Sequence, residues 1–210
     1  MVQIQKIMML GEQLCLDFIN AVGWHPNESM CVEYLTSYSV FIQWCQKTEI
    51  INTEQASFFL EESRKRSVEA DEVIKRVIEL RKSVFRILLA VIAKDTPNEQ
   101  DIDLLNSEIA RVLPFSKLQY TDNQFIWKRA KETKNLDWML SIIVNDIIEL
   151  LTSNKLERLK VCDDDNCGWI FLDMSKNKSR RWCSMQDCGN RAKARRHYYN
   201  KKISKNEETE

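Results

Sequence analysis

Apolar residues recur every three or four positions through most of the first 154 residues, which is the spacing of amphipathic helices. The first of these stretches places Leu14, Phe18 and Val22 on one helical face, before a turn at 24–27. Because similar stretches follow, we expect a body made mainly of helices. Further helices are predicted within 37–51, 53–66, 69–94, 97–112 and 136–153.

Polar residues at the starts of these stretches predict where several helices begin. Ser37 is placed to cap one helix. Asn52 followed by Gln55 has the spacing of a capping box, in which each side chain accepts a hydrogen bond from the other residue's backbone amide. Thr96 is expected to cap the helix that follows it, because Pro97 suits the first helical position.

The two strongest apolar stretches predict where the core lies. Within 69–94, acidic residues gather at the start and apolar residues thicken towards Ile92, so this helix should be half exposed early and buried late. The stretch 136–153 is apolar around most of its circumference and has Asn135 as its expected cap. That pattern is typical of a central core helix.

Between 115 and 128 the period of the pattern changes to two. Leu118 and Tyr120 alternate with polar residues, as do Phe125 and Trp127, and the segment Thr-Asp-Asn-Gln separates the two pairs. This arrangement predicts a β-hairpin. Because an isolated hairpin is only marginally stable, we expect it to lie on the helices.

The charge of the chain is distributed unevenly. The sequence has equal numbers of basic and acidic residues, but 174–205 holds eleven lysines and arginines and one acid, whereas 1–154 holds seventeen bases and twenty-two acids. A basic end on an acidic body favours a polyanion as a partner of that end.

The role of the seven cysteines depends on whether the protein lies in a reducing or an oxidising compartment. No stretch approaches the roughly 20 apolar residues of a membrane span, and the first ten residues lack the features of a signal peptide, so we expect a cytoplasmic protein without a membrane partner. Cytosolic cysteines are mostly free thiols or metal ligands. Cys15, Cys31 and Cys45 stand among apolar residues and are expected to be small buried hydrophobes.

The other four cysteines form the pattern C-x4-C-x15-C-x4-C. Repeated cysteine pairs are what a tetrahedral four-cysteine zinc site requires, and four thiolates leave no open position, so we expect one structural Zn²⁺. The alternatives are a disulfide pair and four unrelated core thiols, but cytosolic disulfides are uncommon and the surrounding residues are polar. The four expected ligands are Cys162, Cys167, Cys183 and Cys188.

The residues around these cysteines predict the local fold. Gly168 and Gly189 follow the second cysteine of each pair, where a positive φ would let the backbone turn under the metal. We expect a strand at 169–172, a return strand at 181–183, and a helix after Cys188, which is the order of a treble clef. The acids at 163–165 are expected to form a solvated loop.

Two segments of this sequence resemble known families. The sequence CDDDNCGWIFLDMSKNKSRRWCSMQDCGNRAKARRHYYNKK at 162–202 resembles the CGNR zinc finger, named after the tetrad that stands here at 188–191. LCLDFIN at 14–20 and the helical body resemble the ABATE domain, which commonly precedes that finger in bacterial proteins described as stress-induced transcription regulators.

These patterns and the resemblance together define the expected architecture. The fold class is mainly α (α+β), with a helical domain that carries one small β-hairpin, followed by a treble-clef-like four-cysteine zinc finger. The expected divisions are an ABATE-like domain over 1–155, a CGNR-type finger with a basic helix over 156–205, and an acidic disordered tail over 206–210. Loss of a cysteine ligand is expected to unfold 162–202 and leave the helical body folded.

Basic residues of the finger are candidates for phosphate contacts, which give salt-dependent affinity without sequence information. Asn190 and Arg191 stand beside the metal, where they are expected to cap the helix, shield the thiolates or pair with Asp173; Gly168 and Gly189 complete this scaffold. The candidates for nucleic-acid binding are Lys176, Lys178, Arg180, Arg181, Arg191, Lys193, Arg195 and Arg196.

These features favour a transcription regulator whose zinc finger binds double-stranded DNA and whose body senses a small-molecule ligand or forms a homodimer. Two alternatives stay open, namely an RNA-binding factor and a protein-interaction adaptor that uses the basic helix. We expect no enzyme and no catalytic residues, because the metal is saturated and the sequence shows no Ser/His/Asp or Cys/His constellation and no phosphate-binding glycine loop.

Overall fold

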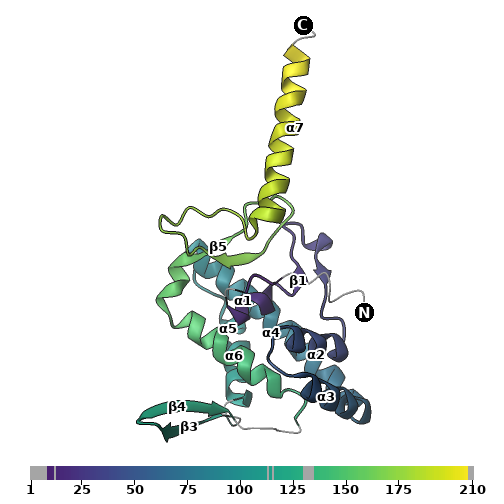
Figure 1. Ribbon diagram of the computed structural model, residues 1–210, viewed down its shortest axis with the longest axis vertical. Helices are drawn as coiled ribbons and strands as arrows, with labels where there is room; N and C mark the ends of the chain where they lie inside the picture. Colours follow the sequence, from purple (N-terminus) through teal and green to yellow (C-terminus); the bar gives the residue numbers. More distant parts are fainter. Residues whose placement is uncertain (1–8, 12, 113, 115, 130–134, 208–210) are drawn as a thin grey trace.

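The computed structural model describes residues 9–207 except 12, 113, 115 and 130–134. The fold is mainly α, as predicted, with the cysteine-rich segment at one end of a helical body and a β-hairpin at the other (Figure 1). None of the described helices is long and apolar enough to cross a membrane. The body contains α1 (Leu14–Ile19), α2 (Tyr38–Lys47), α3 (Thr53–Lys65), α4 (Ser67–Ala93), α5 (Glu99–Val112) and α6 (Trp138–Leu151), with short 3-10 turns η2 (Glu28–Met30) and η4 (Asn154–Arg158).

Two of the predicted helix starts are confirmed. The Ser37 hydroxyl accepts a hydrogen bond from the Val40 amide at 3.3 Å at the start of α2. At the start of α3, the Gln55 amide donates to the Asn52 side chain at 2.8 Å and the Asn52 amide donates to the Gln55 side chain at 3.0 Å, so the capping box is complete.

Two other predicted starts are wrong. α5 begins at Glu99, because the Asn98 side chain accepts from the Gln100 amide at 2.8 Å and takes the capping role expected of Thr96. α6 begins at Trp138, and the cap position is Asp137, whose side chain makes no capping hydrogen bond. Asn135 contributes its carbonyl oxygen, which accepts from the Trp138 amide at 3.1 Å.

The hydrophobic core lies around α6 and the middle of α4. α6 is the expected core helix, with Met139, Leu140, Ile143 and Val144 fully buried. Burial along α4 peaks in its middle, and Leu89 and Ile92 are half-buried. The expectation that α4 is buried late therefore holds as far as Leu88 and is wrong from Leu89 onwards, where the helix borders an open cavity.

The first helix is shorter than predicted. α1 ends at Ile19, and Val22 lies in strand β1 (Val22–Gly23), which pairs antiparallel with β2 (Val32–Glu33). The reason is Asn20, whose buried side chain donates to the Ile170 carbonyl at 2.8 Å and accepts from the Ile170 amide at 3.2 Å. The chain therefore leaves the helix where it meets the finger, and the body contains a second small ladder besides the hairpin.

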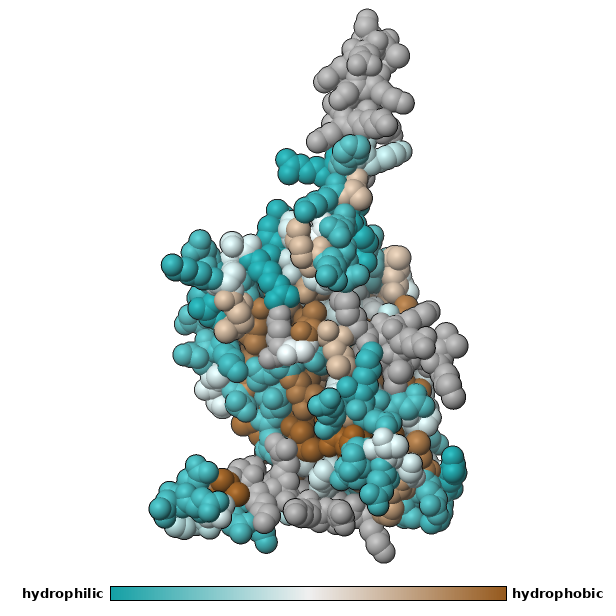
Figure 2. Space-filling view, in the orientation of Figure 1, coloured by the Kyte–Doolittle hydropathy of each residue, from teal (hydrophilic) through white to brown (hydrophobic). Residues whose placement is uncertain are grey.

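The predicted hairpin is present but does not lie on the helices. β3 (Ser116–Thr121) pairs with β4 (Gln124–Arg129) through a turn in which Asp122 and Asn123 have positive φ. Across the strands the rings of Tyr120 and Phe125 are 4.9 Å apart, so these side chains pack on each other. The side chains remain mostly exposed, and the hairpin extends from the body (Figures 1 and 2).

The cysteine-rich segment begins with a ladder that was predicted with the wrong partner. β6 (Ile170–Leu172) pairs with β5 (Leu159–Val161), and 181–183 forms no strand. Leu159, Ile170 and Leu172 are apolar and buried in the core of the body, which gives this pairing its stability. A π-helical turn, η5 (Met185–Gly189), then leads into α7 (Asn190–Glu207), which projects away from the body (Figure 1).

Candidate metal centre and basic helix

The four cysteines predicted as metal ligands lie together. Cys162 follows β5, Cys167 precedes β6, Cys183 lies in the loop after β6, and Cys188 lies in η5 at the base of α7. Their four sulfur atoms all lie within 4.8 Å of one another. The Sγ atoms of Cys167 and Cys183 are 3.8 Å apart, and those of Cys183 and Cys188 are 3.6 Å apart.

These distances fit a tetrahedral zinc ion. With zinc–sulfur bonds of about 2.3 Å, the sulfur atoms of a tetrahedral site lie about 3.8 Å apart. All four residues are buried and each is a free thiol, so the disulfide alternative is not realised. The backbone amide of Cys183 donates to the Cys162 sulfur at 3.4 Å, which supports a thiolate at that position.

Four thiols this close do not ionise together. Hydrogen bonds from Cys167 and Cys183 hold the pKa of Cys162 well below its ordinary value. Hydrogen bonding with Cys162 raises the pKa of Cys167 and of Cys183, and burial raises the pKa of Cys188. A divalent cation among the sulfurs is the group that removes this conflict.

The two glycines beside the cluster lie close to other side chains and do not adopt the positive φ that we expected. Neither Gly168 nor Gly189 has a positive φ. A Cβ on Gly168 would lie 3.1 Å from the Cβ of Trp24, and one on Gly189 would lie 2.5 Å from the sulfur of Met185. Gly168 therefore lets the finger approach the body, whereas at Gly189 the neighbouring atom is the end of the flexible, half-exposed Met185 side chain.

One acid of the segment 163–165 is buried, against the expectation of a solvated loop. Asp164 is 1% exposed, and its carboxylate accepts from Arg191 Nε at 2.7 Å and from Arg195 at 2.5 Å. Its carbonyl oxygen accepts from the Cys167 amide at 2.8 Å. Asp164 therefore joins the loop between the first two cysteines to the first turns of α7.

Arg191 also contacts the cluster itself. Its guanidinium donates to the Cys188 sulfur at 3.0 Å, which is the contact that shielding of a metal-bound thiolate would require, but its carboxylate partner is Asp164 instead of Asp173. Asn190 is exposed, and its side chain donates to the Gln186 carbonyl at 2.8 Å, within the same turn.

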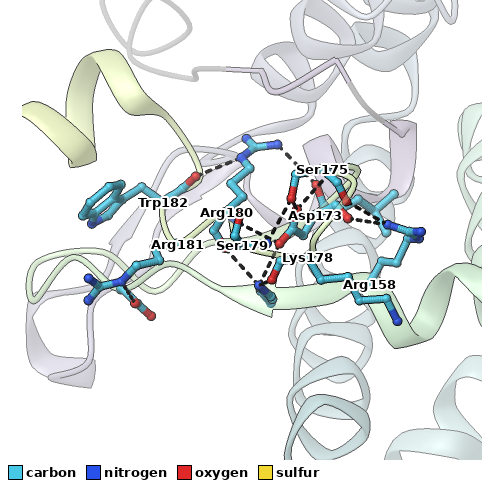
Figure 3. Close-up of polar contacts among 11 residues, drawn as sticks. Arg158, Asp173, Ser175, Lys178, Ser179, Arg180, Arg181 and Trp182 are labelled. Atoms are coloured by element: carbon cyan, nitrogen blue, oxygen red, sulfur yellow. Dashed lines mark hydrogen bonds and ion pairs between the residues drawn. The ribbon is translucent and has the colours of Figure 1, made fainter.

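Asp173 organises the loop after β6 (Figure 3). The fully buried carboxylate accepts from Lys160 Nζ at 2.7 Å, from the Ser175 amide at 3.0 Å and from the Arg180 amide at 2.9 Å. Burial raises the pKa of Asp173, but the hydrogen bonds from Lys160 and Ser175 outweigh it and hold the pKa well below its ordinary range. Arg158 donates to the Asp173 carbonyl at 3.1 Å, so the loop is held from both sides.

Several basic residues predicted to contact nucleic acid are engaged within the finger. Arg180 donates to the carbonyl of Trp182 (Figure 3) and to that of Cys183. Its guanidinium lies 4.6 Å from the ring centre of Phe171. Arg181 pairs with Asp163 at 2.7 Å. Arg191 and Arg195 are engaged by Asp164, and Lys178 lies 3.6 Å from Glu157 in an exposed pair.

Three predicted residues present their charge to solvent. Lys176 lies in the loop after β6, and Lys193 and Arg196 lie three positions apart on α7. All three are exposed, and none makes an ion pair with another described residue. The structure thus separates the basic residues into a group that holds the finger together and a group that faces outwards.

Sequence reasoning missed the residues that join distant segments. Asp164 and Lys160 are charged residues whose partners lie 13 to 31 positions further along the chain. Asn20 is the last residue of the motif LCLDFIN, which marks it as a residue of interest, but the motif does not identify Ile170 as its hydrogen-bond partner.

Comparison with protein families adds two findings. A family model described as "Putative stress-induced transcription regulator" (ABATE) matches residues 12–154, and a model described as "CGNR zinc finger" matches residues 158–201. The four clustered cysteines all fall inside the second match. No curated protein matches the chain.

Proposed function

The chain belongs to the ABATE family of stress-induced transcription regulators and carries a CGNR zinc finger, and from this premise we propose that it regulates transcription by binding double-stranded DNA through the finger. In this proposal the ABATE-like part, 1–155, is the sensing or dimerisation domain, and 156–205 is the DNA-binding domain. Both families are regulatory, so the proposal assigns the chain no catalysis and places it with the DNA, in the cytoplasm of a bacterial cell.

The proposal gives the metal a structural role. Cys162, Cys167, Cys183 and Cys188 would hold one Zn²⁺, and the ion would fix the base of α7 relative to the body. Since all four positions are cysteine sulfurs, no position remains for water or substrate. In this proposal Gly168 would let the chain pack closely beside the site, Asn190 would hold the turn η5, and Asp173 would hold the loop after β6; Gly189 is the fourth member of this scaffold.

The observation that supports DNA binding is the exposed cationic face of α7. The helix has eighteen residues, a length of about 27 Å, and it extends away from the body (Figure 1). Lys193 and Arg196 share one face, and the sequence continues the helix with Lys201, Lys202 and Lys205. A helix with this charge suits the phosphates beside a major groove.

The candidate DNA contacts therefore divide into two groups. Lys176, Lys193 and Arg196 are proposed to bind phosphates directly. Arg191 and Arg195 hold α7 through Asp164, and Arg180 holds the loop after β6, so their contribution to DNA binding is to position the helix. Arg181 and Lys178, in exposed pairs with acids, remain additional candidates.

The test is the salt dependence of DNA affinity. The zinc-loaded full chain is titrated against a labelled duplex between about 50 and 200 mM salt and followed by fluorescence anisotropy. If about six phosphates are neutralised, a plot of the logarithm of the association constant against the logarithm of the salt concentration should have a slope of about −5. The double variant Lys193→Gln/Arg196→Gln should reduce the steepness of that slope by about 2.

A charge-matched control is available on the body. Arg64→Gln/Lys65→Gln removes the same charge from the exposed face of α3, remote from the finger, and should leave the slope unchanged. Equal slopes for the two double variants would contradict the assignment to α7. Tighter binding of single-stranded or structured RNA than of the duplex would favour the RNA-binding alternative.

A further inference from the structure

A cavity of about 710 Å³ opens where the helical body meets the finger. One wall is the second half of α4, with Lys82, Phe85, Arg86 and Leu89, and another is the finger segment 161–165 with Cys167 and Gly168, from the end of β5 to just before β6. Trp24, His25, Pro26 and Cys31 complete the lining. Its volume falls within the range of about 300 to 1,000 Å³ that is usual for small-molecule sites.

The apolar part of the cavity is aromatic and rigid. The rings of Trp24 and Phe85 are stacked, with centroids 3.9 Å apart and planes 10° apart. Trp24 is fixed on both sides, because its indole N–H donates to the Ile19 carbonyl at 2.6 Å and its carbonyl accepts from the Gly168 amide at 3.2 Å. A flat ring of a ligand would therefore meet a preformed surface, which lowers the entropic cost of binding.

The two walls differ in the charge that they offer to a ligand. Asp163 and Asp164 on the finger wall are paired with arginines, and Asp165 lies 3.4 Å from Arg195. On the α4 wall, Lys82 pairs with Glu79 at 3.1 Å, and both side chains are about half exposed, with 44% and 56% of their surface accessible. A surface pair of this kind contributes little, so the ammonium of Lys82 is readily recruited by an incoming anion.

We infer that this cavity binds a small aromatic carboxylate. The ring would lie against Trp24, Phe85 and Leu89, and the carboxylate would be bound by Lys82. Arg86, one turn further along α4, also lines the cavity, but its charge is neutralised by Asp101 at 2.5 Å. Asp163 and Asp165 on the finger wall are exposed and only weakly paired, so they would favour an aromatic amine instead, and a comparison of probes decides between the two charges.

The site also touches the residues that hold the basic helix. Asp164 lines the cavity and at the same time accepts hydrogen bonds from Arg191 and Arg195 of α7. A ligand that shifts the segment 163–165 would therefore change how α7 is held. This regulatory part of the inference rests on the proposed function, whereas ligand binding itself does not.

The experiment uses three probes that share one ring system and differ in charge. Isothermal titration calorimetry of the full zinc-loaded chain, without DNA, compares 2-naphthoate with 2-naphthylmethylamine and with 2-naphthylmethanol. We expect saturable binding of one 2-naphthoate per chain and weaker binding of the neutral and cationic probes. Lys82→Gln should weaken 2-naphthoate binding by about tenfold, because it removes a charge-assisted hydrogen bond.

Two further variants make the result decisive. Lys75→Gln removes an exposed lysine from the same helix outside the cavity and should bind 2-naphthoate like the unchanged chain. Leu89→Trp should weaken 2-naphthoate binding by placing a larger side chain on the apolar wall where the ligand ring would lie, with thermal unfolding used to show that the variant is folded. Tighter binding of the amine, or equal binding by Lys82→Gln and Lys75→Gln, would overturn the inference.

A last measurement separates this inference from the proposed function. Saturating 2-naphthoate should change the affinity of the chain for duplex DNA by about fivefold or more. If 2-naphthoate binds as described and DNA affinity does not change, the regulatory part is wrong and the ligand site stands. If the chain binds no DNA at all, the proposed function fails, and the calorimetric result is unaffected.

Discussion

A single buried carboxylate, that of Asp164, determines how the basic helix leaves the finger. Two arginines of α7 donate to it, and its backbone carbonyl accepts from the amide of Cys167. A buried charge costs several kcal/mol unless it is paired, so Asp164 is stable in this position because Arg191 and Arg195 accompany it. Its neighbours Asp163 and Asp165 are exposed and carry no such constraint.

Replacing Asp164 by asparagine should therefore destabilise the finger strongly. The amide would keep the shape of the side chain but would leave two arginines without their carboxylate, and because these arginines are partly exposed the loss should be about 1–3 kcal/mol. The measurement is the thermal unfolding of the zinc-loaded variant, with protease resistance of 158–201 as a local probe. Asp163→Asn, which breaks the exposed pair with Arg181, should cost less than about 1 kcal/mol. Similar losses in the two variants would show that burial of Asp164 is unimportant.

At the scale of elements, the starts of α2 and α3 were predictable because their signals are local. Asn52 and Gln55 lie three positions apart, and their capping box needs nothing from the rest of the chain. The start of α5 was mispredicted although its signal is also local: Thr96 and Asn98 can both cap a helix, and the sequence pattern does not show that Asn98 is the one used. The partner of β6 was mispredicted because a distant contact decides it, namely the burial of Ile170 and Leu172 in the core of the body.

The contact between α4 and α5 gives stability that depends on pH. Hydrogen bonds from Arg86 and Ser83 lower the pKa of Asp101 below its ordinary value. Because the folded state has the lower pKa, this contact stabilises the protein above the unfolded pKa of about 3.9 and loses its effect as pH falls through the folded value. Asp101→Asn should lower the free energy of unfolding at neutral pH by about 1–3 kcal/mol.

The pH profile separates this electrostatic effect from a packing defect. Urea unfolding between neutral pH and pH 3 should show that the difference between Asp101→Asn and the unchanged chain shrinks as the solution becomes more acidic. Asp103→Asn, at an exposed position of the same helix, should leave stability unchanged at every pH. A difference that stays constant with pH would mean that the carboxylate charge is not the cause.

At the scale of the whole molecule, the finger is not an independent module. Ile170 and Leu172 of β6 are buried in the core of the helical body, and Ile170 exchanges two hydrogen bonds with Asn20. The Trp169 indole donates to the carbonyl of Val22 at 3.0 Å. The sequence predicts a boundary near 155 from the charge shift and from the start of the cysteine pattern, but neither pattern reveals that the two segments share a core.

This shared core changes the expected effect of losing the metal. The sequence predicts that Cys183→Ser unfolds 162–202 and leaves the body folded. The structure predicts that α1 and β1 also lose protection from hydrogen exchange, because Asn20, which lies between them, is hydrogen-bonded to Ile170 of β6. Hydrogen exchange of the zinc-loaded chain, of the chelated chain and of Cys183→Ser should show early loss of protection at α1 and β1. Protection at α3, remote from the finger, should persist longest.

The matched control is Cys31→Ser, which changes a half-buried thiol outside the cluster and should keep both zinc and protection. Structural zinc sites contribute on the order of 10 kcal/mol to folding, so a chain in which β6 connects the site to the body should lose much of its stability on chelation. Full protection of α1 in the zinc-free chain would show that the body folds without the finger. Stoichiometric zinc in Cys183→Ser would show instead that this cysteine is not a ligand.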